Sequence, residues 1–320
     1  MLLRIRSVTW LTDEINAYEL VDPNGHDLPR FDAGAHIAVR LGPNDGSGAV
    51  WRDYSLWNDP AERRRYCIAV LRDKEGQGSR QLHDTARPGD LAEVSWPRNH
   101  FRLAEGAERH LLIAGGIGIT PIMAMIAELK RRRAEFRLHY CTRAPEKTAF
   151  RDELELLAAI GRARFHYDGG DPSKGLDIAA LLRERDPGTH LYYCGPAGLM
   201  RAAAAASSHW PADTVHFEYF TGPAAAPPAA LADDRPFRVR LAQSGGEYEV
   251  PAGETIAAVL KRNGVEVRVS CELGYCGTCL TRYLDGEPDH RDEILNDTAR
   301  KTHLLTCCAR AKGDLLVLDL

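Results

Sequence analysis

The sequence predicts a multi-domain protein of three modules, in the order antiparallel β, parallel-sheet α/β and small α+β. The first observation is the length of 320 residues, which exceeds what a single hydrophobic core usually organises. The second is a change near His110 from short alternating segments to repeated strand-helix units. The third is a Pro- and Ala-rich break, TGPAAAPPAALADDRP, which is typical of an interdomain linker. We place the modules at residues 1–102, 103–222 and 237–320, with the linker at 223–236.

The composition is that of a soluble globular protein. Hydrophobic residues make up 44% of the chain, charged residues make up 27%, and the formal net charge is -4. The 41 Lys and Arg residues are spread along the sequence, so nothing indicates a nucleic-acid partner. No apolar run approaches the roughly 18 residues that a membrane span needs, and no signal-peptide core follows Arg4 and Arg6. We therefore expect a cytoplasmic protein without a membrane partner, and a monomer because each module has its own core.

The first module consists of short alternating segments, AHIAVRL, RYCIAVL and DLAEVSW, separated by Gly, Pro, Asn and Asp. Alternation of this kind indicates strands with one buried face. Several such strands predict a small antiparallel barrel or sandwich.

The second module repeats a strand followed by a helix. HLLIA precedes PIMAMIAELKRRR, FRLHYCT precedes a helix near RDELELLAAI, and a third strand, HLYYCG, precedes AGLMRAAAAA. Units of this kind build a parallel sheet.

The loop after the first of these strands, LLIAGGIGITPIMAM, is a candidate dinucleotide-binding site. It departs from the fingerprint G-x-G-x-x-G because Pro121 stands where the third glycine belongs. Thr120 can cap the helix, and Pro121 fits its first turn. Gly115, Gly116 and Gly118 would then bring the backbone close to a pyrophosphate at the helix N-terminus.

The third module combines a hairpin, FRVRLAQ with GEYEVPAG, a short helix at ETIAAVLKRNG and a closing strand at LLVLDL. Between helix and closing strand lies VSCELGYCGTCL, which spaces Cys271, Cys276 and Cys279 as C-x4-C-x2-C. A zinc site would favour paired C-x2-C units, and disulfides would need an oxidising compartment. The spacing is that of a plant-type 2Fe-2S cluster, whose distant fourth ligand must be Cys307 or Cys308.

The residues around these thiols favour the same cluster. Gly274, Gly277 and Thr278 leave the loop with little side-chain bulk. Backbone N-H groups can then turn inward toward cluster sulfurs.

The segment RDYSLWN resembles the flavin-binding motif of the ferredoxin reductase superfamily, although by itself it could be an edge strand. The resemblance implies that Arg52 meets the flavin phosphate, Tyr54 packs against the isoalloxazine and Ser55 hydrogen-bonds near N5. A guanidinium suits a phosphate because its donors match two oxygens. The loop GQGSR, ahead of a short helix at QLHDTA, would hold the same phosphate. Its contributing residues would be Gly78, Ser79 and Arg80.

Two further features match that superfamily. The turn Cys194, Gly195 and Pro196 would lie beside the nicotinamide, although a plain strand-to-helix turn with a buried thiol is the alternative. Phe220 matches an aromatic residue that covers the flavin face, with core packing as the alternative. Arg143, after the second strand, could touch the adenosine end of the dinucleotide or a 2'-phosphate, or lie on the surface.

Together the motifs, in this order, resemble the phthalate dioxygenase reductase family, which includes vanillate O-demethylase and carnitine monooxygenase reductases. The resemblance implies an FMN-binding antiparallel β-barrel, an NAD-binding α/β domain with a parallel sheet of about five strands, and a 2Fe-2S ferredoxin domain of the β-grasp fold. It also implies Cys307 as the fourth cluster ligand.

The implied function is transfer of electrons from NADH through FMN and the cluster to a Rieske-type oxygenase. Ser55, Cys194 and Phe220 would line the transfer site, whereas His36, His83 and His100 are interpreted as solvated or core histidines. Two alternatives remain at this stage. The same chain of carriers could serve a haem-thiolate monooxygenase or another acceptor, or the thiols could belong to a zinc-stabilised interaction protein.

Overall fold

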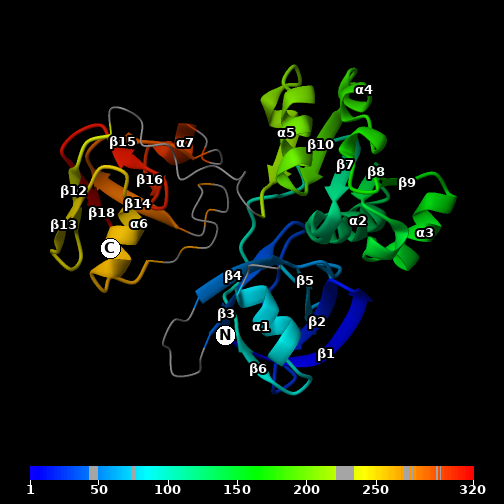
Figure 1. Ribbon diagram of the computed structural model, residues 1–320, viewed down its shortest axis with the longest axis horizontal. Coiled ribbons are helices and arrows are strands. Elements are labelled where there is room, and N and C mark those ends of the chain that lie inside the picture. Colours follow the sequence, from blue (N-terminus) through cyan, green and yellow to red (C-terminus); the bar gives the residue numbers. More distant parts are fainter. Residues whose placement is uncertain are drawn as a thin grey trace. The chain divides into compact units, whose positions relative to one another are not determined.

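The computed structural model describes residues 1–42, 50–73, 77–220, 234–267, 269, 274, 277, 279–292, 295 and 297–320. It divides the chain into two compact units, Met1–Glu218 and Tyr219–Leu320. The first unit holds the β module and the α/β module, and the second holds the α+β module (Figure 1). No helix among these residues is both long and apolar enough to cross a membrane.

The β module of the first unit is a small barrel. Its strands are β1 (Leu2–Thr12), β2 (Ile15–Val21), β3 (His36–Leu41), β4 (Val50–Ser55), β5 (Tyr66–Leu71) and β6 (Leu91–Glu93). One antiparallel sheet has the order β5-β2-β1-β6, and β3 pairs with β4. Isolated bridges join Val39 to Val94 and Leu56 to Ile68. These bridges connect the two sheets at both edges. The module is therefore the predicted barrel and not a sandwich.

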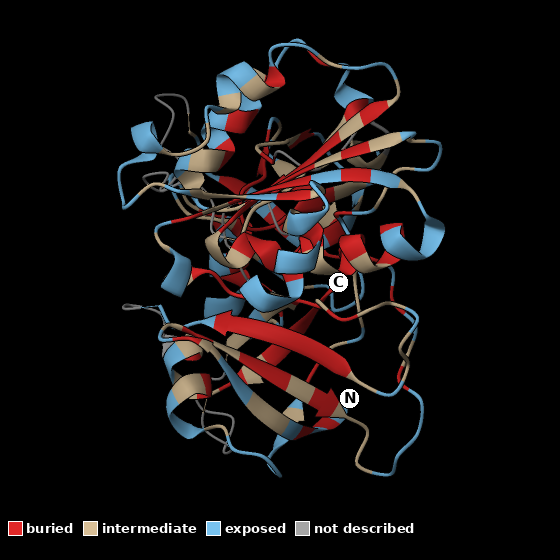
Figure 2. Ribbon diagram, turned by 90° about the vertical axis from the view of Figure 1, so that its right-hand side faces the viewer, coloured by how far each residue is buried: buried red, intermediate tan, exposed pale blue. Residues whose placement is uncertain are grey.

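The alternation seen in the sequence produces the barrel core. Along β1, Leu3 and Ile5 are buried while Arg4 and Arg6 are exposed, because successive side chains of a strand point to opposite faces. Figure 2 shows buried residues concentrated on the strands of the first unit and exposed ones on the outer faces of its helices.

The α/β module contains a five-stranded parallel sheet of order β11-β10-β7-β8-β9. Its strands are β7 (Arg109–Gly115), β8 (Glu135–Thr142), β9 (Ala163–Tyr167), β10 (Thr189–Cys194) and β11 (Val215–Glu218). Its α-helices are α2 (Ile119–Arg132), α3 (Arg151–Ala159), α4 (Ile178–Leu182) and α5 (Ala197–Ala206).

The strand order reverses between β7 and β10. Moving from β7 through β8 to β9, the chain runs one way across the sheet, and from β10 to β11 it runs the other way. Right-handed crossovers therefore place α2 and α3 on one face and α5 on the other, as Figure 1 shows. Ligands of such sheets bind at the carboxyl ends of the strands beside this switch point.

Two local expectations were wrong. The strand HLYYCG is the fourth strand of its module in chain order, because β9 precedes it. Its sequence, ARFHY, mixes Arg and His with apolar residues, so the sequence pattern did not indicate this strand. The helix α1 (Gln77–Thr85) begins earlier than QLHDTA, so Gly78, Ser79 and Arg80 lie in its first turn and not in a preceding loop.

The second unit has the predicted α+β character. Its main sheet has the order β13-β12-β18-β14-β16, with β12 and β13 as the expected hairpin. The strands are β12 (Phe237–Leu241), β13 (Glu247–Val250), β14 (Leu280–Asp285), β15 (Pro288–Asp289), β16 (His303–Leu305), β17 (Arg310–Ala311) and β18 (Leu315–Leu318). The helices are α6 (Ile256–Arg262) and α7 (Asp297–Arg300). The side chains of Val239, Ile256 and Leu316 are among those that form its own hydrophobic core.

A buried arginine ties the segment at Asp234 and Arg235 to the body of the second unit. Arg310 is 5% exposed and donates hydrogen bonds to the carbonyl oxygens of Glu254, Arg235 and Pro251. Its guanidinium also pairs with Asp234 at 3.4 Å. A buried charge is stable only when it is paired and hydrogen-bonded in this way. These bonds therefore fix the position of Asp234 and Arg235 against the rest of the unit.

Candidate functional site

A candidate phosphate-binding corner forms where β4 meets the N-terminus of α1. Arg52 on β4 is exposed, and Gly78 in the first turn of α1 lies against it. A Cβ on Gly78 would lie 2.7 Å from Leu41 Cδ1 and 3.3 Å from Arg52 Cγ. A larger residue at position 78 would force the Leu41 side chain to move, so glycine favours the approach of the helix start to Arg52, and both groups attract phosphate. Arg80 is exposed in the same turn, whereas the Ser79 hydroxyl accepts a hydrogen bond from the Asp73 amide at 3.1 Å.

The next residues of β4 face the barrel. Tyr54 is half-buried and packs against the barrel core, and this burial raises the pKa of its phenol. Ser55 is 4% exposed and pairs with His36 across the β3-β4 ladder. Arg52 and Tyr54 lie on the same face of β4 and Ser55 lies on the other, because successive side chains of a strand point to opposite faces. Their roles toward a flavin stay predictions.

Glu218, at the end of β11, connects β4 to the α/β module. The Ser55 hydroxyl donates a long hydrogen bond of 3.5 Å to Glu218 Oε2, and His36 Nδ1 lies 3.6 Å from Glu218 Oε1. Glu218 is also the register partner of Cys194 on β10. The carboxylate therefore stands where the barrel and the parallel sheet meet.

Cys194 is fully buried, and burial raises the pKa of its thiol well above the ordinary value, with a smaller contribution from Glu218. It remains a neutral thiol at neutral pH. Such a thiol acts as a small, uncharged packing group and does not provide a thiolate nucleophile.

The glycine loop and the Cys-Gly-Pro turn pack backbone against backbone at the switch point. A Cβ on Gly118 would lie 2.3 Å from the Cys194 carbonyl oxygen, and one on Gly195 would lie 3.0 Å from Gly115 Cα. A Cβ on Gly115 would meet Pro196 Cδ at 2.7 Å. By contrast, a Cβ on Gly116, whose φ is +51°, would meet nothing within 4 Å. Gly115 and Gly118 of the glycine loop are thus packed closely against the Cys-Gly-Pro turn, whereas Gly116 has open space beside it.

The predicted cap of α2 is wrong. Gly118 occupies the N-cap position, and no side chain caps the helix there. The hydroxyl of Thr120 instead donates to the Ile117 carbonyl oxygen at 3.0 Å, and the side chain is buried. Pro121 lies in the first turn as expected, since it needs no N-H there. The N-H of Ile119 already donates to the carbonyl oxygens of Gly116 and Ile117, so a ligand would meet the amides of the preceding turn Gly116–Gly118.

Two predicted residues lie at the margins. Arg143 is exposed directly after β8, at the carboxyl edge of the sheet. Phe220 is half-buried and belongs to the second unit, two residues beyond Glu218. Its role over the flavin stays a prediction.

In the second unit, two predicted cluster ligands lie close together. Cys279 and Cys307 are 3% and 2% exposed, and their thiols interact. The amide and hydroxyl of Thr306 both donate to the Cys279 carbonyl oxygen at 3.3 Å. These bonds hold the two segments side by side. Cys271 and Cys276 lie outside the described residues.

The loop glycines fit the expected cluster. Gly274 and Gly277 have φ of +82° and +71°, in the left-handed region that glycine occupies without strain. A Cβ on Gly274 would lie 2.9 Å from Cys308 Sγ, and the Cys308 thiol lies 3.8 Å from the Leu305 carbonyl oxygen. Cys308 therefore packs against Gly274, while the Cys307 thiol interacts with that of Cys279.

Comparison with known proteins bears on both units. Residues 112–205 match the family model of the oxidoreductase NAD-binding domain, and residues 239–312 match that of the 2Fe-2S iron-sulfur cluster binding domain. The reductase subunit of tert-butanol monooxygenase / tert-amyl alcohol desaturase from Aquincola tertiaricarbonis is 48% identical, over 99% of this chain and 95% of that protein.

Solved structures also match this chain. Phthalate dioxygenase reductase, described as a modular structure for electron transfer from pyridine nucleotides to [2Fe-2S], is 43% identical. The match covers 100% of this chain and 98% of that one, with a TM-score of 0.72. The chain belongs to the phthalate dioxygenase reductase family. An intact type IV self-sufficient cytochrome P450 monooxygenase also matches, at 36% identity and a TM-score of 0.87, over 100% of this chain and 41% of that one.

Membership in the phthalate dioxygenase reductase family identifies the modules. The barrel is the flavin-binding domain, the parallel sheet belongs to the nicotinamide domain and the second unit is the ferredoxin domain. The protein is an oxidoreductase. The match to the 2Fe-2S model leaves the zinc-stabilised interaction protein without support.

Two residues that sequence reasoning did not select lie at this candidate site. Glu218 lies in HFEYF, where only Phe220 was selected, and His36 was interpreted as solvated or core-satisfied. His36 is buried and faces Glu218, which agrees with its interpretation as a core histidine and places it next to the candidate site. The sequence carried no clear signal for Glu218, because every residue of the edge strand β11 is only partly buried and an acidic residue at the end of such a strand can face solvent.

Proposed function

We propose that this protein is the NADH-dependent reductase component of a Rieske-type oxygenase system. The observation that carries the proposal is the meeting of Ser55, Glu218 and Cys194, which joins the flavin motif to the nicotinamide turn. When bound, FMN accepts a two-electron hydride from NADH and passes electrons singly to the 2Fe-2S cluster.

The chain's own residues bind and orient these groups. Arg52 and the first turn of α1 would hold the FMN phosphate, and Tyr54 and Ser55 would contact its ring. The amides of the Gly115–Gly118 loop would hold the dinucleotide pyrophosphate. Cys194, uncharged and buried, would keep water from the nicotinamide, and Glu218 would fix the direction of the Ser55 hydroxyl.

The cluster would be held by Cys271, Cys276, Cys279 and Cys307. The interacting thiols of Cys279 and Cys307 and the left-handed glycines of the loop support this ligand set. We also propose a cytoplasmic location, because thiolate ligands of a 2Fe-2S cluster persist in a reducing compartment and the second unit matches the model of such a cluster domain. We also propose that the protein is a monomer that meets its oxygenase only transiently.

The test is the visible spectrum of the purified protein during an anaerobic NADH titration. We expect flavin bands on a broad iron-sulfur envelope, both bleached by NADH. A colourless protein with one equivalent of zinc would contradict the proposal. Loss of the bleaching with NADH, in a coloured protein, would contradict the nicotinamide site alone.

The acceptor has a second candidate. The cytochrome P450 match covers this whole chain, so the same module works fused to a haem-thiolate domain in that protein. Turnover of the reduced reductase with a purified Rieske oxygenase and with a separate haem-thiolate monooxygenase distinguishes the two. We expect rapid oxidation by the Rieske protein only.

A further inference from the structure

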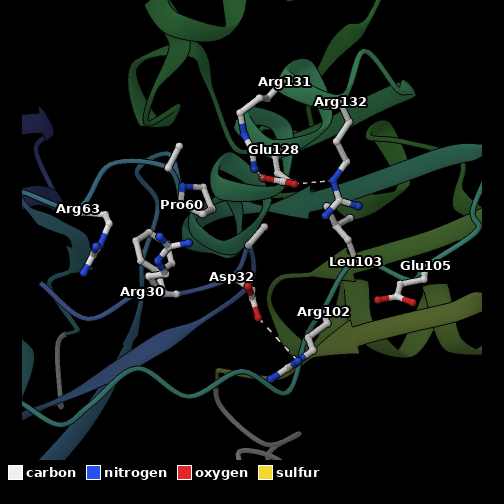
Figure 3. Close-up of a pocket in the computed structure, with 13 residues that line it drawn as sticks. Arg30, Asp32, Pro60, Arg63, Arg102, Leu103, Glu105, Glu128, Arg131 and Arg132 are labelled. Atoms are coloured by element: carbon white, nitrogen blue, oxygen red, sulfur yellow. Dashed lines mark hydrogen bonds and ion pairs between the residues drawn. The ribbon is translucent and has the colours of Figure 1, made fainter.

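A cavity of about 510 Å³ opens in the first unit between loops of the barrel and the C-terminal end of α2 (Figure 3). The glycine loop lies at the opposite end of this helix, before Ile119. The helix is 14 residues long, which corresponds to roughly 20 Å at 1.5 Å per residue. The cavity is therefore separate from the site described above.

The walls of the cavity are rich in arginine. Five guanidiniums line it together with three carboxylates, an excess of two positive charges. The arginines are Arg30 and Arg63 on barrel loops, Arg102 on the segment that leaves the barrel, and Arg131 and Arg132 on α2. Figure 3 shows them arranged around the opening from several sides.

One of the three carboxylates is already neutralised. Glu128 is 7% exposed and is hydrogen-bonded by both Arg131 and Arg132. Burial alone raises the pKa of Glu128, but the hydrogen bonds from Arg132 and Arg131 outweigh it, and the pKa is lowered. Glu128 therefore stays charged and holds the two arginines in place at the edge of the cavity.

Several guanidinium donors remain available, although Arg63 already donates to the Leu28 carbonyl oxygen at 3.2 Å and pairs with Asp27 at 3.6 Å. A guanidinium carries five N-H donors, and Glu128 takes up only part of those on Arg131 and Arg132, whose side chains are 53% and 51% exposed. Within the described part of the chain, Arg30 has no hydrogen-bond or ion-pair partner. Arg102 has only a distant pair with Asp32, at 3.7 Å.

Between these charges the lining is apolar. Phe31 and Ala33 are 7% and 5% exposed, and Pro60 and Leu103 complete this part of the wall. A site with an apolar wall and several convergent polar groups suits a small molecule with a carbon skeleton. A flat arginine patch for a macromolecule would lack this apolar wall.

We propose that this cavity binds a small anion with two or more carboxylate or phosphate groups. One anionic group would meet Arg131 and Arg132, and the other would meet Arg30 and Arg102. Guanidiniums bind both chemical groups through paired, charge-assisted hydrogen bonds. Because Arg30 and Arg102 come from the barrel side and the other two from α2, the bound anion would join the two modules of the first unit.

Calorimetric titration of the holoenzyme with citrate and with pyrophosphate tests the proposal. Saturating NAD⁺ occupies the dinucleotide site, and sodium chloride keeps the ionic strength constant. The test variant is Arg30→Gln with Arg102→Gln, which leaves the Glu128 pairs intact. The control is Arg4→Gln with Arg137→Gln, two exposed arginines of the same unit outside the cavity.

We expect saturable binding of at least one anion to the wild-type protein. The test variant should bind it about tenfold or more weakly, because charge-assisted hydrogen bonds are lost. The control should remain within about twofold. Tighter binding of citrate would identify a carboxylate ligand, and tighter binding of pyrophosphate a phosphate ligand. Absence of saturable heat, or equal binding by the test variant and the wild type, would overturn the proposal.

Discussion

Glu218 contacts Ser55 although 163 positions of sequence separate the two residues. The contact depends on the strand order of the parallel sheet, which brings the end of β11 beside the end of β10 and toward the barrel. Its carboxylate lies within 3.6 Å of the buried His36 and 3.5 Å of the Ser55 hydroxyl. A single side chain therefore sets the orientation of both neighbours.

Replacing this carboxylate by an amide tests that role. We expect Glu218→Gln to keep FMN bound but to slow reduction of the flavin by NADH by about tenfold to a hundredfold, because a misplaced Ser55 costs a rate of this order. Anaerobic stopped-flow absorbance measures the rate, and its pH profile should also change. Glu93→Gln, at a 52% exposed side chain on β6, is the control. An unchanged rate and pH profile in Glu218→Gln would refute the role.

The close backbone approach at Gly118 allows a second test at this scale. In Gly118→Ala the new methyl group would meet the Cys194 carbonyl carbon and oxygen at 2.5 and 2.3 Å, and backbone atoms cannot move aside cheaply. We expect KM for NADH to rise about tenfold or more while the flavin and cluster spectra persist. The matched control is Gly198→Ala in α5, where a Cβ would meet nothing within 4 Å. A normal KM in Gly118→Ala would show that the two loops can separate without consequence.

At the scale of elements, two histidine pairs join neighbouring strands of the parallel sheet. His139 Nδ1 lies 3.0 Å from His166 Nε2, and His190 Nδ1 lies 3.0 Å from His216 Nε2. Such a hydrogen bond needs an acceptor nitrogen without a proton. Burial first, and the partner imidazole second, lower the pKa of His139 and of His216 from 6.5 to about 4.

These pKa values predict acid sensitivity of the nicotinamide sheet. The unfolded chain binds protons at these histidines below about pH 6.5, whereas the folded chain binds them only near pH 4, so the free energy of unfolding falls as pH falls between these values. Each residue contributes about 1 to 3 kcal/mol to that loss. Urea unfolding at pH 7 and pH 5 measures it.

A double variant isolates the effect of the pairs. We expect His139→Gln with His216→Gln to reduce the difference in stability between the two pH values. His26→Gln should leave the difference unchanged, because the His26 side chain is 75% exposed. An equal difference in wild type and double variant would assign the acid sensitivity to other groups.

Elements with a strong local signal were predictable from sequence. The segment AGLMRAAAAA is rich in alanine, the best helix former, and forms α5 over Ala197–Ala206. By contrast, Gly118 took the N-cap position expected of Thr120, since packing against Cys194 decides that turn. The spacing of the cysteines indicated a cluster, but no local pattern indicated that Glu218 would reach Ser55. That contact comes from topology, which a local pattern does not encode.

At the scale of the whole molecule, each unit carries its own hydrophobic core. Leu3, Ile37 and Tyr66 belong to the barrel core, whereas Val239 and Leu316 belong to the core of the ferredoxin domain. Arg310 and Asp234 anchor the described start of the ferredoxin domain within its own unit. The units therefore have the internal contacts needed to fold independently.

Separation of the units tests this independence. We expect the segment 1–220, produced alone, to bind FMN and to reduce ferricyanide with NADH at a rate close to that of the full chain. Its rate of cytochrome c reduction, which we expect to depend on the cluster, should fall by about tenfold or more, because the ferredoxin domain with its covalently linked 2Fe-2S cluster is missing. An insoluble or flavin-free segment would show that the first unit needs the second. Full cytochrome c reduction would show that the cluster is bypassed.

The buried, protonated state of Cys194 has a consequence for chemical durability. A reductase that meets air releases some of its electrons to oxygen and forms peroxide. Peroxide attacks thiolates, and the thiol of Cys194 is both inaccessible and held in its protonated form. Cys194 is therefore protected from conversion to sulfenic acid, and its thiol stays uncharged where the two modules of the first unit meet.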